Sequence, residues 1–279
     1  MNPVLELPRQ EVKPVLTEAM ATRQAQEVQV AMLAAKKFPR DQNESLDRIL
    51  KACERKTLAQ KALYSYPRGD TTVTGPSIRL AETIKQNWGN MEAGVIELEQ
   101  KLGESVCMSY AWDYESNNRE VRTFTIKHER KAKNGTQKLT DDRDIYEKVA
   151  NNGARRERAC ILAIVPGDVV EAAVEKCKSV LKTELQKDNR SFTEKIKDLF
   201  DNFKEFNVTK EMIQKFIGSS SIKEEDYIKL LGAYNSLKDG VAKPDAFFEF
   251  GKENLKDPLV NDFLNDLNKG GALNGNQSS

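Results

Sequence analysis

Histidine, paired cysteines and long apolar runs are scarce or missing in this chain, and each shortage removes a class of function. His128 is the single histidine, and no CxxC pair occurs among the four widely spaced cysteines, which are Cys53, Cys107, Cys160 and Cys177. We therefore expect neither a zinc site nor a catalytic site of the Ser-His-Asp or Cys-His type. No apolar run is long enough to span a bilayer, and the N-terminal residues lack the apolar core of a signal peptide. These shortages predict a cytoplasmic protein that has no membrane among its partners.

Motifs for nucleotide hydrolysis are missing as well. The chain contains no GxxxxGK[ST] loop, and no GxGxxG follows a predicted strand. Acidic runs occur at Asp141-Asp142 and at Glu224-Glu225-Asp226, where a magnesium-dependent nuclease could hold its metal. Both runs lie at predicted helix starts, and capping explains them there. We expect a protein that is not an enzyme and that uses no metal or other cofactor.

A local excess of basic residues is hidden by a balanced total charge. The whole chain has 44 Lys and Arg against 43 Asp and Glu, a net charge of +1. Residues 119–158 hold 12 basic and 7 acidic side chains, a net +5, whereas residues 191–279 hold 12 and 15, a net −3. A basic segment of this kind is suited to an acidic polymer, and the alternative is an ordinary solvated face.

The hydrophobic periodicity predicts an α+β fold. Residues 91–127 alternate between apolar and polar positions in three runs, with turn residues between them. This pattern is typical of a three-stranded antiparallel (or larger) β-meander with one buried face, packed on helices. Helical spacing predicts the surrounding elements, which cover residues 15–38, 44–63, 77–88, 144–166 and 168–185. Gly153 is expected to break or kink the fourth of these helices.

Changes in composition divide the chain into four parts. Residues 1–40 are predicted to form an N-terminal arm and helix, and residues 41–186 an α+β core that is the candidate nucleic-acid-binding domain. Residues 191–250 read as a small all-helical module with helix caps at Thr209 and Ser221. Residues 251–279 have the composition of a flexible tail.

The most informative stretch is residues 151–174, where Arg155, Arg156 and Arg158 lead an otherwise apolar helical segment. The planar guanidinium group carries donors that suit phosphate oxygens. Arginines anchored on a buried helix would form a rigid anion-binding edge. The candidate nucleic-acid-binding residues combine this edge with the basic loop at 128–143 and with one helix start, and they are Arg155, Arg156, Arg158, Lys127, Arg130, Lys131, Lys133, Arg79, Thr74 and Ser77.

Six aromatic rings are candidates for stacking on bases, and they are Tyr64, Tyr66, Trp88, Tyr110, Trp112 and Phe124. At least half of them are expected in the core instead. The arginines are also close enough in sequence to pair with Glu157, Asp168 or Glu171. In that case the chain would be a non-enzymatic structural or adaptor protein, docking through its acidic helical module.

Two blocks of sequence, joined by the meander, resemble the RecT/Red-beta/ERF type of phage single-strand annealing protein: TGPSIRLAETIKQNWGN (residues 74–90) and TDDRDIYEKVANNGARRERACILAIVPGDVVEAAVEKC (140–177). The helical block at 195–240 is similar to small helical modules at the ends of such recombination proteins, so the resemblance covers about residues 60–250. It implies binding of single-stranded DNA and annealing of complementary strands without ATP. It also implies a homo-oligomer that works beside an exonuclease and a single-strand-binding protein, in the cytoplasm of a bacterial host.

Overall fold

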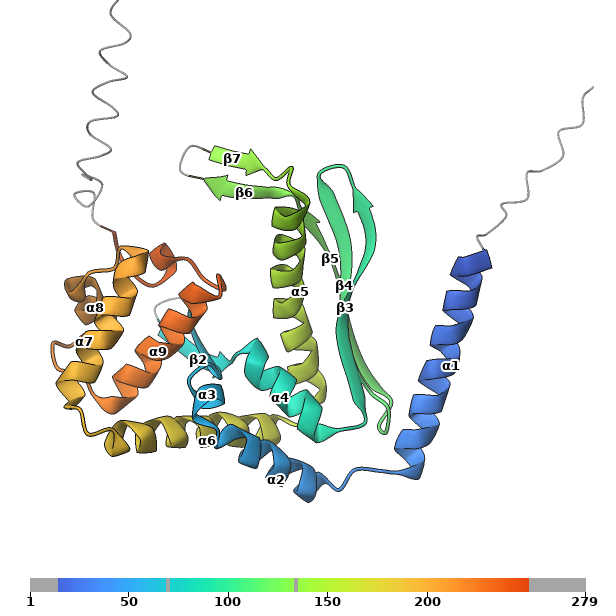
Figure 1. Ribbon diagram of the computed structural model, residues 1–279, viewed down its shortest axis with the longest axis horizontal. Coiled ribbons are helices and arrows are strands. Elements are labelled where there is room, and N and C mark those ends of the chain that lie inside the picture. Colours follow the sequence, from blue (N-terminus) through green and yellow to red (C-terminus); the bar gives the residue numbers. More distant parts are fainter. Residues whose placement is uncertain (1–14, 69–70, 133–134, 251–279) are drawn as a thin grey trace, which may run out of the picture. The chain divides into compact units, whose positions relative to one another are not determined.

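The computed structural model describes residues 15–68, 71–132 and 135–250, and the fold is α+β (Figure 1). The chain divides into two compact units. The first unit comprises Met1–Leu63 and Gly75–Glu184, and the second comprises Tyr64–Thr74 and Leu185–Ser279. The start of the predicted arm and the predicted tail at 251–279 lie outside the described residues.

Capping side chains mark the start of three helices in the first unit. The helices of this unit are α1 (Val15–Lys37), α2 (Gln42–Cys53), α3 (Lys56–Ala59), α4 (Ile78–Trp88), α5 (Asp142–Ile164) and α6 (Gly167–Lys187). The side chains of Asp41, Ser77 and Asp141 each accept a hydrogen bond from a backbone N–H in the first turn of the helix that follows. These caps satisfy donors that the helix itself leaves unpaired.

The single helix expected over residues 44–63 is wrong, because the chain divides it into α2 and α3. The amides of Glu54 and Arg55 bond to carbonyls three residues earlier, which tightens the last turn of α2. Arg55 is then extended, with ψ of 117°, and stands at the N-cap position of α3. No glycine or proline marks this break, so the sequence carried no signal for it.

The predicted meander is confirmed. Its strands are β3 (Met91–Lys101), β4 (Glu104–Asp113) and β5 (Asn118–Lys127), antiparallel in the order β3-β4-β5. Along β4, buried residues such as Cys107, Ser109 and Ala111 alternate with half-buried ones such as Tyr110 and Trp112. The buried face of the sheet packs against α5 (Figure 1). This side of the sheet therefore fixes the position of the helix that carries the three arginines.

The unbroken course of α5 corrects the expected kink at Gly153. The helix runs from Asp142 to Ile164, and Gly153 packs against Val95 of β3. A Cβ atom at this position would stand 2.7 Å from a methyl carbon of Val95. The carbonyl of Gly153 also accepts a hydrogen bond from the Ser109 hydroxyl at 3.2 Å. The glycine is there for close packing of helix on strand rather than for bending.

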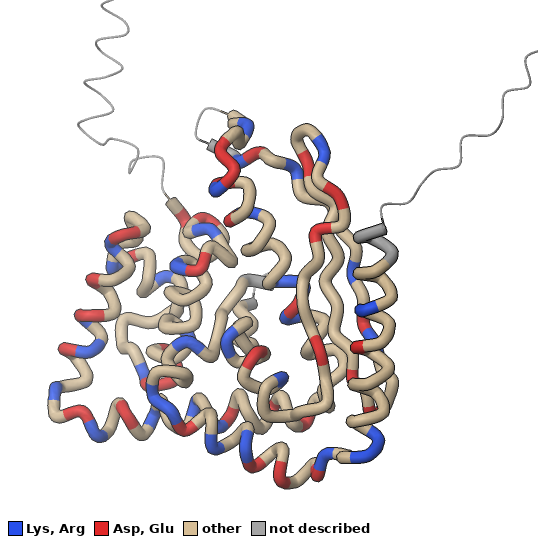
Figure 2. Tube along the Cα trace, turned by 45° about the vertical axis from the view of Figure 1, so that its right-hand side comes forward, with Lys and Arg blue, Asp and Glu red and all other residues tan. Residues whose placement is uncertain are grey.

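The basic loop contains a short hairpin. Strands β6 (Glu129–Ala132) and β7 (Gly135–Lys138) pair antiparallel within residues 128–143. Its base is anchored through His128, which is 5 % exposed and shares a hydrogen bond of 2.7 Å with the Ser105 hydroxyl. Figure 2 shows cationic and anionic residues interspersed along most of the described chain. The basic excess at 119–158 is therefore a local feature of the first unit.

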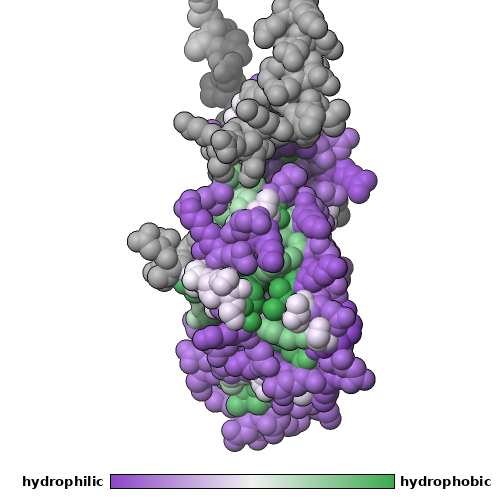
Figure 3. All heavy atoms as spheres, turned by 90° about the vertical axis from the view of Figure 1, so that its left-hand side faces the viewer, coloured by the Kyte–Doolittle hydropathy of each residue, from purple (hydrophilic) through white to green (hydrophobic). Residues whose placement is uncertain are grey.

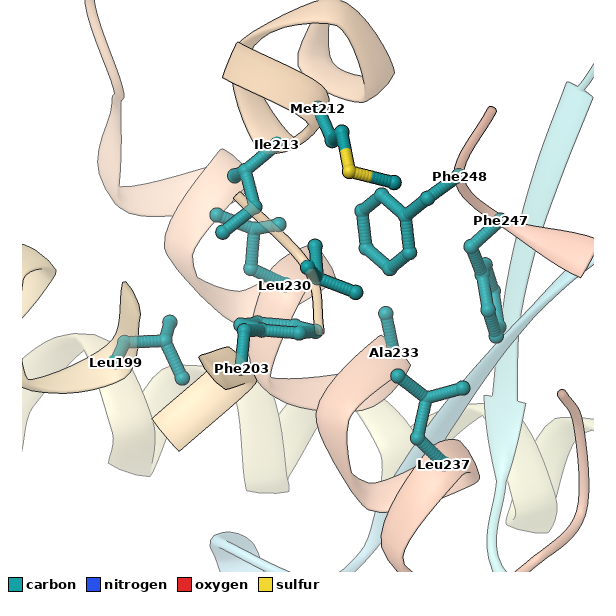
Figure 4. Packing of buried hydrophobic residues seen from close by; sticks show 10 residues of the cluster. Leu199, Phe203, Met212, Ile213, Leu230, Ala233, Leu237, Phe247 and Phe248 are labelled. Atoms are coloured by element: carbon teal, nitrogen blue, oxygen red, sulfur yellow. The ribbon is translucent and has the colours of Figure 1, made fainter. Parts of the chain in front are cut away.

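Helices and one hairpin make up the second unit. Its elements are β1 (Leu63–Arg68), β2 (Thr71–Pro76), α7 (Phe192–Phe203), η1 (Lys204–Phe206), α8 (Lys210–Ile217), α9 (Glu224–Lys238) and η2 (Pro244–Ala246). Figure 4 shows the side chains of its core, where Phe203, Leu230 and Phe248 lie between the helices. Thr209 caps α8 as expected. The expected cap at Ser221 is wrong, because Lys223 holds the N-cap position of α9 and the Asp226 carboxylate accepts its backbone N–H.

The β1-β2 hairpin groups with the C-terminal helices and not with the 41–186 core to which the sequence assigned it. It packs on α9 where two small residues allow close approach. The Ser236 hydroxyl donates to the carbonyl of Ser65 at 2.6 Å, and the Ser65 hydroxyl donates to the carbonyl of Lys229 at 3.0 Å. A Cβ atom on Gly232 would lie 2.5 Å from the Ser65 hydroxyl oxygen, so this contact requires glycine.

Candidate nucleic-acid interface

The arginine edge lies on α5, and its three members do not share one direction. Gly153 and Cys160 face the sheet, since Gly153 contacts Val95 and the Cys160 thiol donates to the carbonyl of Ser109. Each helical residue turns the side-chain direction by about 100°. Arg155 and Arg158 therefore lie on neighbouring turns of the face that points away from the sheet. All three arginines are half-buried.

Arg156 is turned toward β5 instead. Its guanidinium carbon lies 4.1 Å from the centre of the Phe124 ring, and one of its nitrogens donates to the carbonyl of Asn152 at 3.0 Å. A guanidinium held against an aromatic face is ordered by cation–π attraction and keeps its remaining donors in one plane. This pair supplies a planar cationic group and a ring beside each other.

Glu157, the acidic residue inside the arginine cluster, is held by a lysine from another helix. Lys85 on α4 lies 3.3 Å from the Glu157 carboxylate, and it also donates to the carbonyl of Ala93 on β3 at 3.3 Å. Their side chains are 24 % and 15 % exposed. The contact ties α4, α5 and the edge strand β3 together, and it partly neutralises the carboxylate that lies between the arginines in the sequence.

Lys148 joins the arginine face to the basic hairpin, and the sequence analysis missed it. It precedes Arg155 by seven residues, which is two turns, or about 10 Å along the helix. Its ammonium group donates to the carbonyl of Glu129 at the start of β6. The spacing of Lys148 and Arg155 was visible in the sequence as a signal for one shared helix face.

Two other predicted cations, Lys127 and Arg130, lie in or beside the β6-β7 hairpin. Lys127 ends β5 and is exposed, and Arg130 on β6 is exposed with its Nε donating to Gln137 at 3.1 Å. The backbone of Lys131 belongs to β6, but its side chain lies outside the described residues, as does the whole of Lys133. The structure thus brings Lys127 and Arg130 to the hairpin that Lys148 connects to α5.

The helix start at 74–79 does not join this interface. Ser77 is fully buried, where its hydroxyl donates to the carbonyl of Lys61 at 2.7 Å and accepts the N–H of Leu80. Thr74 belongs to the second unit and shares a 3.1 Å hydrogen bond with Ser65. Arg79 is 62 % exposed and lies 3.8 Å from the Glu82 carboxylate. Ser77 therefore acts as a buried helix cap and is not exposed to a ligand.

The candidate rings are divided between core and surface. Tyr64 and Trp88 are 2 % and 3 % exposed and belong to the cores. The other four rings retain exposed surface, and they are Tyr66, Tyr110, Trp112 and Phe124. Two of the six rings are buried, so the expectation that at least half of them lie in the core is wrong.

Tyr110 and Trp112 occupy the sheet face that lies away from α5, beside an acidic group. The hydroxyls of Tyr110 and Tyr114 both donate to the Glu92 carboxylate. Burial, together with this carboxylate, raises the pKa of both phenols well above the ordinary value, so they remain protonated donors. This face also lines a cavity of about 630 Å³ to which Glu27 of α1 contributes. Its carboxylates make it a poorer phosphate site than the α5 side.

The acidic runs and the cysteines have structural roles in the described chain. Asp141 accepts the backbone N–H groups of Arg143 and Asp144 at 3.0 and 3.1 Å, as a helix cap does. All four cysteines are buried free thiols, as expected for Cys160 and Cys177, and burial raises the pKa of Cys160. Among the described residues no group of three or more His, Cys, Asp or Glu is placed to hold a metal ion.

Comparisons with known proteins gave no match to a protein-family model, a curated protein or a solved structure. Within the part of the chain that the structure describes, no helix has both the length and the apolar character needed to cross a membrane.

Proposed function

We propose that the chain binds single-stranded DNA along α5 and the β6-β7 hairpin and anneals complementary strands without ATP. The observation that carries the proposal is the gathering of cations from three neighbouring elements in one unit. Arg155 and Arg158 share the outer face of α5, Lys148 links that face to the hairpin, and Lys127 and Arg130 extend it. Such a row of charges would follow a phosphate backbone without reading base sequence.

The pair of Arg156 and Phe124 supports a single-stranded ligand over a duplex. Bases in a single strand expose their faces, and aromatic or guanidinium planes can stack on them. Annealing would then require only that the strand be held by its phosphates with its base edges free. The annealing step and the homo-oligomer rest on the resemblance to RecT/Red-beta/ERF proteins.

The adaptor alternative places the arginines in internal ion pairs with Glu157, Asp168 or Glu171. Of these three carboxylates, Glu157 forms a salt bridge with Lys85 of α4, so it already has a cationic partner. A gel shift with a single-stranded oligonucleotide separates the two functions. An adaptor would give no shift that depends on salt.

Fluorescence anisotropy with a fluorescein-labelled single-stranded oligonucleotide tests the binding site. The wild-type chain should bind with an affinity that falls steeply between about 50 and 200 mM salt. Replacing Arg155 and Arg158 with alanine should lower the affinity and reduce the slope of log K against log salt by about 1.4, at roughly 0.7 per phosphate contact on a single strand. An unchanged affinity and slope, with unchanged circular dichroism, would refute the proposed site.

Arg143→Ala is the matched control on the same helix. Arg143 is 85 % exposed in the first turn of α5 and pairs with Glu147 at 3.1 Å, and it is not one of the proposed phosphate contacts. Arg143→Ala removes one positive charge, as Arg155→Ala or Arg158→Ala does alone. Its salt slope should stay at the wild-type value, so a loss equal to that of Arg155→Ala would mean that only net charge matters.

A further inference from the structure

The second unit has an apolar groove on the side formed by α7, η1 and the start of α8. The groove encloses about 840 Å³ and is bordered by residues from 193 to 210. Ile196 and Phe200, both half-buried, lie one turn apart on α7, and the buried Val208 lies between η1 and α8. Figure 3 views this side of the molecule and shows an apolar strip bordered by hydrophilic atoms. A groove of this form suits the apolar stripe of a helix.

The rim of the groove is basic although the region from 191 onward is acidic overall. Lys197, Lys204 and Lys210 border it, with Asp201 as the one acidic residue on the lining. Asp201 is paired with Lys204 at 2.6 Å, and this contact lowers the pKa of its carboxyl. Lys197 and Lys210 stand at the rim as exposed cations. The groove therefore favours an apolar segment flanked by carboxylates.

Residues 257–267 of this chain, DPLVNDFLNDL, have that chemistry. Apolar residues recur with helical spacing at Leu259, Val260, Phe263, Leu264 and Leu267. Asp257, Asp262 and Asp266 fall on the two sides of this stripe, and the segment has no basic residue. Asp257 followed by Pro258 is a typical helix start, and Gly270-Gly271 is a typical stop. A helix this short is unstable alone in water and needs a surface on which to bury its stripe.

The described chain leaves the second unit close to the groove. Glu249 pairs with Lys215 on α8 at 2.5 Å. Lys215 lies five residues from Lys210 at the rim, which is about 7.5 Å along the helix axis. Residues 251–256 can span up to about 20 Å, so they can carry residue 257 to the groove.

We propose that residues 257–267 dock as a short amphipathic helix in the α7–α8 groove of the same chain. Leu259, Phe263 and Leu267 would cover Ile196 and Phe200, and Asp262 and Asp266 would face the lysines of the rim. The docked segment acts as a built-in occupant that any other acidic amphipathic helix must displace. This proposal is independent of DNA binding by the first unit.

Hydrogen exchange measured by mass spectrometry on the full chain tests the docking. In the wild type, the amides of residues 259–267 should exchange at least about tenfold more slowly than in the free peptide of the same sequence. Phe263→Asp should abolish this protection and speed exchange in residues 196–210. Phe263→Leu, which keeps the apolar stripe, should retain both. Exchange of 259–267 at the free-peptide rate in the wild type would overturn the proposal.

A charge swap distinguishes docking in this groove from burial elsewhere. Lys197→Glu with Lys210→Glu should reduce the protection of 259–267, and adding Asp262→Lys with Asp266→Lys should restore it. Failure of the second pair to restore protection would overturn the assignment to the groove. Protection that disappears on dilution, together with a dimeric mass by light scattering, would place the segment in a second copy and contradict docking within one chain.

Discussion

Replacing Gly153 with alanine should destabilise the first unit, against the usual effect of this change in a helix. At an exposed position, Gly→Ala stabilises a helix by about 1 kcal/mol. Here the added Cβ would lie 2.7 and 3.0 Å from the two methyl carbons of Val95, well inside the usual contact distance of about 3.5–4.0 Å. Valine is stiff about χ1 and cannot easily turn away. Overpacking costs about 1–3 kcal/mol, so we expect a net loss of about 1 kcal/mol.

Urea unfolding followed by tryptophan fluorescence measures this loss. Both tryptophans, Trp88 and Trp112, lie in the first unit, so their emission follows that unit. Asn151→Ala is the control, because Asn151 is exposed on the same helix and the change should stabilise slightly. Val95→Ala should remove the cost of Gly153→Ala, with a coupling energy of about 1–2 kcal/mol in the double-mutant cycle. A Gly153→Ala variant as stable as Asn151→Ala would refute the close packing of α5 on β3.

Three further outcomes follow from contacts within each unit. Arg40→Ala should cost about 3–5 kcal/mol in urea unfolding, since Arg40 lies 2.7 Å from Asp113 and 2.8 Å from Glu115 with 6 % of its side chain exposed. Burial acts to raise the pKa of Glu115, but hydrogen bonds from Arg40 and Asn90 hold it below the ordinary value. Its contribution to stability is therefore present above the unfolded pKa of about 4.5 and lost as pH falls through the folded value, so acid titration of stability should be weaker in Arg40→Ala. Gly232→Ala should lower the thermal stability of the second unit by about 1–3 kcal/mol, because its Cβ would meet Ser65, and an unchanged melting temperature would contradict that contact.

Local chemistry made the helix starts and the meander predictable from the sequence. A side chain that caps a helix bonds to N–H groups two or three residues away, as Asp41 does, and this pattern is visible without the fold. Alternation along residues 105–113 likewise marks a strand with one buried face. The end of α2 was missed because hydrogen bonding alone, with no glycine or proline, terminates it.

Contacts between residues far apart in the sequence determine the features of the fold that the sequence did not predict. The hairpin at 64–74 groups with α9 through Ser65 and Gly232, which are more than 160 residues apart. The cationic character of α5 was predictable, but the turn of Arg156 onto Phe124 and the burial of Ser77 depend on packing. The role of the candidate residues in DNA binding stays a prediction.

The rate of strand annealing without nucleotide tests the central proposal most directly. Two complementary oligonucleotides, one with a donor dye and one with an acceptor, are mixed with the protein, and energy transfer reports duplex formation. The wild-type chain should speed annealing well above the spontaneous rate with no ATP present. The triple variant with alanine at Arg155, Arg156 and Arg158 should return it to the spontaneous rate, and Arg143→Ala should behave as the wild type. An unaccelerated rate with the wild-type protein, under conditions where it binds each strand, would contradict the proposed annealing function.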